Sequence, residues 1–229
     1  MPVDLSASLG YPAWQDDWIR FVLPTGRMMK TGLEHLRRAG YSWEEGGSSR
    51  RLLFHNDVQG AMLLLAKPSD VLTYVSRGVA DLGIIGKDML LESQTEVVEL
   101  ADLEFAQCRL VLAAPAGSTD VRAGMRVATK YPNLAQGYFS RLNLPVELIL
   151  LQGSVELAPL VGLADMIIDL VDSGQTLKEN DLVVLDTVVK SSARLVANSS
   201  SYHVKPKLLS TVAERVESMT IRGESNAHS

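Results

Sequence analysis

Short apolar runs alternate with helical patterns along most of the chain. The run 19–23 ends at Pro24 and predicts a strand, and apolar residues then recur at helical spacing from Met29 until Gly40. Further runs that predict strands lie at 61–65, 82–85, 110–114, 126–129, 146–151, 166–171, 182–185 and 194–197. Further helices are expected after Ser69 or Asp70, from Pro132 and over 205–216. This succession predicts an α/β fold with parallel crossovers.

The pattern also suggests how the chain divides. Turn residues accumulate over 114–124, where a change of lobe is expected. We expect lobe I to comprise 18–112 and 188–229, and lobe II to comprise 113–187. Residues 1–17 have mixed polarity and no sustained period, which indicates an irregular N-terminal extension. No internal repeat, low-complexity tract or charge block is evident.

Composition narrows the class of protein. The 229 residues are 46% hydrophobic and 21% charged, which is typical of a folded globular chain, and the net charge of -5 argues against a nucleic-acid surface. No apolar run is long enough to span a bilayer and no signal peptide is apparent, so a cytoplasmic protein is expected. Cys108 is the single cysteine, which excludes an internal disulfide, and the four histidines lack metal-ligand spacing.

The segment 166–177 carries the most informative chemistry. Its apolar strand contains Asp169, whose carboxylate can accept hydrogen bonds from vicinal sugar hydroxyls. The turn that follows is rich in hydroxyls: Gly174 permits close backbone approach, and Ser173 and Thr176 supply donors for a phosphate. An ordinary β-turn with a capped helix is the alternative. The pattern therefore indicates either such a turn or a site for a phosphorylated ribose.

Several segments resemble the ATP phosphoribosyltransferase family, which opens histidine biosynthesis. The run 153–180 matches its signature through Glu156, Gly-Leu-Ala-Asp at 162–165, Asp169 and Ser-Gly-x-Thr-Leu at 173–177. Further resemblance lies in Arg-Val-Ala-Thr-Lys-Tyr-Pro-Asn at 126–133, in 80–88 and in 23–27, so that it covers about 19–216.

The resemblance implies a fold and a reaction. The fold would be two α/β lobes of the periplasmic-binding-protein type II kind, with an active-site cleft between them, ATP on lobe I and phosphoribosyl pyrophosphate on lobe II. In the reaction, adenine N1 of ATP displaces pyrophosphate from 5-phosphoribosyl 1-pyrophosphate to give 1-(5-phosphoribosyl)-ATP. The chain would be a glycosyltransferase that uses substrate-bound Mg²⁺, with no metal held by protein ligands alone.

The resemblance also implies roles for particular residues. Arg27 and Arg50 match arginines that act on the pyrophosphate, although surface solvation is the alternative for a lone arginine. The expected phosphoribosyl pyrophosphate site is Glu156, Asp169, Ser173, Gly174, Gln175 and Thr176. The expected ATP site is Gly26, Arg27, Asp81, Gly86 and Asp88, for which ordinary strand-end and turn roles are the alternative. Asp165 is a further candidate contact, for which capping of the turn between Gly162 and Met166 is the favoured interpretation.

Two further features bear on function. Thr25 stands where the family has a lysine, which removes one cation and raises the alternative of a non-catalytic nucleotide-binding paralogue. A two-lobed solute-binding protein is another alternative. The chain resembles the short form of the family, which implies a homodimer within a hetero-oligomer that includes a histidyl-tRNA-synthetase-like regulatory subunit.

Overall fold

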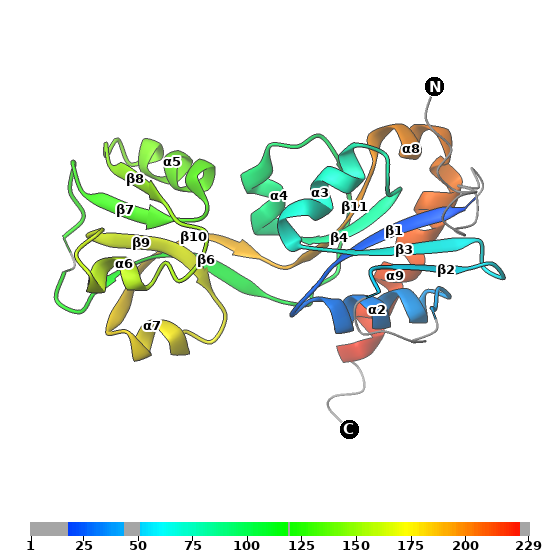
Figure 1. The fold of residues 1–229 in the computed structure, drawn as a ribbon, viewed down its shortest axis with the longest axis horizontal. Helices are drawn as coiled ribbons and strands as arrows, with labels where there is room; N and C mark the ends of the chain where they lie inside the picture. The colour runs from blue at the N-terminus through cyan, green and yellow to red at the C-terminus, as the bar shows by residue number, and fades with distance from the viewer. Residues whose placement is uncertain (1–17, 44–50, 119, 225–229) are drawn as a thin grey trace. The chain divides into compact units, whose positions relative to one another are not determined.

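Two compact units, each built around its own sheet, make up the chain (Figure 1). The computed structural model describes residues 18–43, 51–118 and 120–224, with side chains as far as 217. Of these, unit 1 comprises 18–43, 51–85, 96–103 and 195–224, and unit 2 comprises 86–118 and 120–194. Two α/β units are therefore confirmed. Within the described ranges, no helix combines the length and apolarity that a bilayer crossing requires.

Unit 1 contains a six-stranded sheet with a parallel centre. Strand β1 is parallel to β3 and β4, and β2 is antiparallel to β3. Gly83 of β4 lies so close to α3 that an added Cβ would be 2.7 Å from Val75 Cγ2, so the bare backbone is what allows this packing. The strands in spatial order are β2 (Leu53–Asn56), β3 (Ala61–Ala66), β1 (Ile19–Pro24), β4 (Leu82–Gly86), β11 (Ala193–Ala197) and β5 (Val98–Asp102). The helices are α2 (Met29–Arg38), α3 (Pro68–Ser76), α8 (Ser199–Val204) and α9 (Pro206–Glu224).

Unit 2 contains a five-stranded mixed sheet with a packed core on each face. Met166 and Ile168 of one strand belong to one core, and Ile167 and Val171 belong to the other. Because side chains alternate along a strand, covering both faces requires the continuous apolar run seen in the sequence. The strands in order are β10 (Leu182–Ser191), β6 (Cys108–Pro115), β9 (Met166–Val171), β7 (Arg126–Thr129) and β8 (Glu147–Leu150). The helices are α4 (Lys87–Ser93), α5 (Pro132–Arg141), α6 (Leu157–Leu160) and α7 (Gln175–Glu179).

The chain changes unit at places other than those expected. The boundaries after 112 and after 187 fall inside β6 and β10, which pair antiparallel from Leu182 opposite Pro115 to Ser191 opposite Cys108. The turn-rich segment 115–124 joins β6 to β7 within unit 2. This antiparallel pairing, which runs along both strands with two register shifts, keeps them in one unit, whatever the turn composition beside them.

Each unit contains a short segment of similar sequence that leads from the end of a helix into a strand. Residues 78–85 read Gly-Val-Ala-Asp-Leu-Gly-Ile-Ile, and residues 162–169 read Gly-Leu-Ala-Asp-Met-Ile-Ile-Asp. Both begin with a glycine at φ +72 that ends a helix. Both then lead into a strand, β4 or β9, that is the third of three parallel neighbours, β3-β1-β4 in unit 1 and β8-β7-β9 in unit 2. Asp81 and Asp165 therefore occupy equivalent positions.

Candidate functional site

The carboxyl ends of β7 and β9 place a lysine beside a carboxylate in unit 2. Thr129 is opposite Ile168 in the parallel register, so the residues that follow them, Lys130 and Asp169, lie next to each other. Lys130 Nζ is 3.1 Å from Asp169 Oδ1, and the side chain of Asp169 is 16% exposed. The backbone N–H of Leu170 donates to the same oxygen at 2.8 Å. Ligands of open α/β sheets commonly bind at this edge.

The loop after β9 presents small polar groups to solvent. Gly174 has φ +81, a conformation that favours glycine, and it immediately precedes α7. The N–H of Gln175 donates to Ser173 Oγ at 3.4 Å, and the Gln175 side chain donates to Glu179 at 2.7 Å. Thr176 is exposed. The turn chemistry expected from the sequence is thus present, and it leaves hydroxyls and backbone N–H groups at the surface.

Glu156 lies on the connection from β8 to α6, half-buried and directly before the helix. Because β8 is the parallel neighbour of β7, this connection leaves the sheet at the same edge as Lys130. Among the residues that the structure describes, no hydrogen bond links Glu156 to Asp169 or to the 172–176 loop. The structure therefore places these residues on successive connections at one sheet edge without joining them directly.

Helix α4 is held within unit 2 by two acidic side chains. Asp88, which is 5% exposed, accepts from Ser191 Oγ at 2.6 Å and from the hydroxyl of Tyr131 at 3.1 Å. Burial, followed by the nearby Asp88 carboxylate, raises the pKa of Tyr131 well above its ordinary value. Glu92 accepts from the N–H groups of Asn133 and Leu134, both at 2.9 Å, and so caps α5.

Unit 1 has a comparable loop at the carboxyl end of β1. Gly26 has φ +90, and its carbonyl accepts from the N–H of Met29 at 3.1 Å, closing a turn into α2. Arg27 is exposed on that turn, and Thr25 donates its N–H to Ala66 O at 2.7 Å. Arg50, the other predicted catalytic arginine, lies outside the described residues.

A family model for ATP phosphoribosyltransferase matches residues 67–218 of the chain. The chain is 44% identical to the ATP phosphoribosyltransferase of Geobacillus sp. (strain WCH70) over 199 residues, which cover 86% of this chain and 97% of the relative. It is 42% identical to that of Bacillus subtilis (strain 168) over 207 residues, which cover 90% and 97%. The chain belongs to the ATP phosphoribosyltransferase family.

A solved structure of the family shares this fold. It is an ATP phosphoribosyl transferase (HisG:HisZ) complex from Thermotoga maritima, with a TM-score of 0.79 and 33% identity, covering 89% of this chain and 99% of that chain. The likeness confirms two lobes of the type II periplasmic-binding-protein kind, as expected from the sequence. The two-lobed solute-binding protein and the non-catalytic paralogue are not favoured.

Asp81 supports the fold and has no exposed surface through which it could contact ATP. The residue is fully buried, and its carboxylate accepts from the backbone N–H, Nε and Nη2 of Arg20, each at 2.9 Å, and from Ser201 Oγ at 2.7 Å. The expected direct contact with ATP is therefore corrected to a structural ion pair inside unit 1. The strand-end alternative was the better interpretation.

Two more predicted ATP contacts have structural explanations. Asp88 belongs to unit 2 rather than to the lobe expected to bind ATP, and both of its carboxylate oxygens are engaged in the buried contacts to Ser191 and Tyr131. Gly86 is buried before α4, where an added Cβ would collide with the Asp88 carboxylate. Both residues therefore shape the start of α4. Of the expected ATP residues, Gly26 and Arg27 remain on an accessible loop.

Asp165 repeats the arrangement of Asp81 at a more exposed place. It accepts from the backbone N–H of Arg126 at 2.8 Å and from its Nη2 at 2.9 Å, with 36% of the Asp165 side chain exposed. Hydrogen bonds from the Arg126 side chain and then from its backbone N–H lower the pKa of Asp165. The expected capping of its own turn is thus replaced by a pairing with β7.

The structure brings in residues that the sequence pattern did not mark. Lys130 and Tyr131 follow a predicted strand directly, and a polar residue at the carboxyl end of a parallel strand was the available signal. Arg20 is a charged residue inside an apolar strand, which is a sign of a buried partner. That partner is 61 residues away and could not be named from the sequence.

We expect Asp81 to contribute to the loss of stability in acid. Burial raises the pKa of Asp81, but the hydrogen bonds from Arg20 and Ser201 outweigh it, and the net shift is downward. Such a carboxyl stabilises the fold above its unfolded pKa of about 4 and ceases to do so as the pH falls through its folded pKa. The variant Asp81→Asn should therefore lose less unfolding free energy than the wild type between about pH 5 and pH 3. Urea denaturation at each pH measures this, and equal losses in the two proteins would contradict it.

Proposed function

We propose that the chain transfers the 5-phosphoribosyl group from 5-phosphoribosyl 1-pyrophosphate to N1 of the adenine of ATP, through the site described in unit 2. The adenine lone pair forms the new bond to C1 of the ribose, and the bond from C1 to the pyrophosphate oxygen breaks. Pyrophosphate leaves with that electron pair. The observation that carries the proposal is Asp169, held by Lys130 on the strand that leads into a hydroxyl-rich turn, in a chain of this family.

In unit 2, some residues contact the ribose and others contact the 5′-phosphate. Asp169 and Glu156 accept hydrogen bonds from the ribose hydroxyls, since an ionised carboxylate is an acceptor only. The hydroxyls of Ser173 and Thr176 donate to the 5′-phosphate, together with backbone N–H groups at Gly174 and Gln175. The Gln175 side chain is engaged with Glu179 at 2.7 Å, whereas its backbone N–H makes only a long bond of 3.4 Å to Ser173 Oγ, so we assign the phosphate contact to the backbone N–H.

Arg27 and Arg50 act on the pyrophosphate group of phosphoribosyl pyrophosphate. Negative charge grows on the departing pyrophosphate, and a fixed guanidinium stabilises that charge in the transition state more than in the ground state. Gly26, whose positive φ shapes the turn, lets Arg27 stand on a short loop at the end of β1. Adenine N1 has its own lone pair, so orientation rather than a general base is the main requirement.

Mg²⁺ fits this scheme as a metal carried by the substrate. Among the described residues, no group of three or more His, Cys, Asp or Glu side chains could hold a metal ion. Mg²⁺ commonly binds substrate phosphates with few protein ligands, so the pyrophosphate oxygens would hold it. It would supply charge neutralisation on the leaving group.

We also propose an assembly for the enzyme. The solved relative is a HisG:HisZ complex, which supports a hetero-oligomer of this chain with a regulatory subunit related to histidyl-tRNA synthetase. Within it the chain would form a homodimer. We place the enzyme in the cytoplasm, where its charged substrates are available.

The proposed function is tested by measuring formation of phosphoribosyl-ATP from the two substrates, with and without the regulatory subunit. We expect product that depends on both substrates and on Mg²⁺, and a change in rate when the subunit is added. Failure to form phosphoribosyl-ATP under either condition would overturn the proposal and favour the non-catalytic paralogue.

Both arginines should affect turnover, and Arg50 should do so with little effect on ATP affinity. Arg27→Ala and Arg50→Ala are each expected to lower kcat about a hundredfold, because removing one positioned donor costs about that much. In Arg50→Ala the dissociation constant for ATP should change far less, whereas Arg27→Ala should also weaken ATP binding, because Arg27 is an expected ATP contact as well. Arg37→Ala is the matched control, because Arg37 is exposed on α2 and pairs with Glu34. Unchanged turnover in Arg50→Ala would refute its role at the leaving group.

A further inference from the structure

Lys130 lies in the segment 126–133, which resembles the family and contains none of the residues proposed to contact the substrates. Its ammonium is 3.1 Å from Asp169 Oδ1, with 36% of the Lys130 side chain and 16% of the Asp169 side chain exposed. Fully exposed pairs of this kind contribute little, but partial shielding from water strengthens the attraction and narrows the geometry. The pair therefore constrains the carboxylate more than a surface salt bridge would.

The neighbouring residue Tyr131 fixes the backbone next to Lys130. The N–H of Tyr131 donates to Thr129 Oγ1 at 2.9 Å, and its hydroxyl donates to the buried carboxylate of Asp88. The Tyr131 side chain is almost fully buried, and Lys130 Nζ lies 5.6 Å from the centre of its ring. This distance is within the range of a cation–π interaction. The ammonium thus has an aromatic ring and a carboxylate as partners.

The two oxygens of Asp169 are used unequally. Oδ1 receives both the Lys130 ammonium and the N–H of Leu170. Among the described residues, no group donates to Oδ2. An ionised carboxylate has lone pairs on both oxygens, so Oδ2 is the oxygen able to accept hydrogen bonds from a ligand.

We infer that Lys130 is a positioning residue that holds Asp169 by one oxygen and so presents the other to the vicinal hydroxyls of the ribose. The inference rests on the proposed function, since Asp169 must contact the sugar. Its consequence is specificity: the site should favour a phosphorylated ribose over a phosphorylated 2-deoxyribose, because only the former offers both hydroxyls to an oriented acceptor.

The inference is tested with ribose 5-phosphate and 2-deoxyribose 5-phosphate as competitive inhibitors against phosphoribosyl pyrophosphate. In the wild type, the inhibition constant of the deoxy sugar should be about tenfold higher, the worth of one charge-assisted hydrogen bond. Lys130→Met should reduce the ratio to about twofold. Lys130→Arg, which keeps the charge, should restore most of it.

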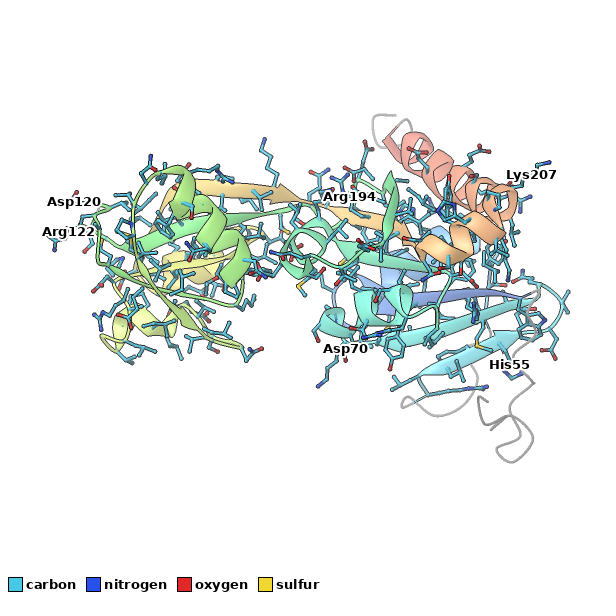
Figure 2. The ribbon with its side chains drawn as sticks, turned by 90° about the horizontal axis from the view of Figure 1, so that it is seen from above. His55, Asp70, Asp120, Arg122, Arg194 and Lys207 are labelled. Atoms are coloured by element: carbon cyan, nitrogen blue, oxygen red, sulfur yellow. The ribbon has the colours of Figure 1, made fainter. Side chains whose placement is uncertain are left out.

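Arg122→Met is the matched control for loss of a positive charge. Arg122 is exposed and points outward (Figure 2). It precedes β7, whereas Lys130 follows β7, so the two residues lie at opposite ends of that strand. Its ratio should equal that of the wild type. A merely structural role of Lys130 would weaken both inhibitors equally, so an unchanged ratio in Lys130→Met would overturn the inference.

The outcome is separable from that of the proposed function. Formation of phosphoribosyl-ATP by the wild type tests the proposed function directly, without reference to the inhibitor ratio. If the wild type is active and Lys130→Met discriminates as the wild type does, the positioning role fails alone. If the wild type forms no product and neither sugar phosphate binds, both fail.

Discussion

Asp169→Ala is expected to lower kcat/KM for phosphoribosyl pyrophosphate about a thousandfold. The change removes the acceptor that we propose for the ribose hydroxyls, and hydrogen bonds to a charged group are worth about 1.5–3 kcal/mol each. Two such bonds correspond to about a thousandfold. It also leaves Lys130 without its carboxylate partner beside the substrate. Thr176→Val should give a smaller loss, about tenfold, because its hydroxyl is one of several donors proposed for the 5′-phosphate.

Steady-state kinetics with each substrate varied in turn measure these effects. The KM for ATP should stay within about twofold of the wild-type value. Equal losses of affinity for both substrates would instead indicate a damaged fold. Asp120→Ala serves as the control for loss of a carboxylate, because Asp120 is exposed in the segment before β7 and points outward (Figure 2). Normal binding of phosphoribosyl pyrophosphate to both Asp169→Ala and Thr176→Val would show that the sugar phosphate site is elsewhere.

The regular parts of the fold could be predicted because their patterns are local. Strands β7 and β9 and the start of α5 at Pro132 occur where the sequence predicts them. Apolar runs and N-terminal prolines act over a few residues, so they can be read directly. Helix α4 and strands β2 and β5 were not predicted, because each is short and only partly apolar. Their positions depend on contacts such as Glu92 with α5, which the sequence does not display.

In the candidate site, too, the locally determined features could be predicted and those that depend on tertiary partners could not. The loop 172–176 was predicted because glycine and hydroxyl residues determine its turn locally, and Gly174 has the positive φ that such a turn requires. The roles of Asp81 and Asp88 could not be separated from ligand binding by sequence alone. Each is a carboxylate near the end of a strand, and only tertiary partners, Arg20 and Ser191, show that it is buried and used.

The similar segments 78–85 and 162–169 allow the same aspartate–arginine pairing to be compared in the two units. Asp81 and Asp165 follow the same Gly-x-Ala sequence, accept from the same three nitrogens of an arginine, and donate their own N–H to that arginine's carbonyl. Their burial differs: the side chain of Asp81 is 1% exposed and that of Asp165 is 36% exposed. The chain thus contains two ion pairs of the same geometry, one buried from water and one partly exposed to it.

Asp81→Ala is expected to destabilise unit 1 by about 3–4 kcal/mol, since removing one partner leaves a partly buried charge uncompensated. Asp165→Ala should cost a small fraction of that, because water can replace the lost carboxylate at an exposed site. Trp18 and Trp43 are the tryptophans among the described residues and both lie in unit 1, so fluorescence in urea follows that unit. Far-UV circular dichroism follows both units. The Asp81→Ala transition should shift to lower urea with an unchanged slope, while Asp165→Ala leaves the fluorescence transition in place. Equally small shifts of the circular dichroism transition in the two variants would mean that burial does not decide the strength of this pair, and that the arginine relaxes into solvent in unit 1 as well.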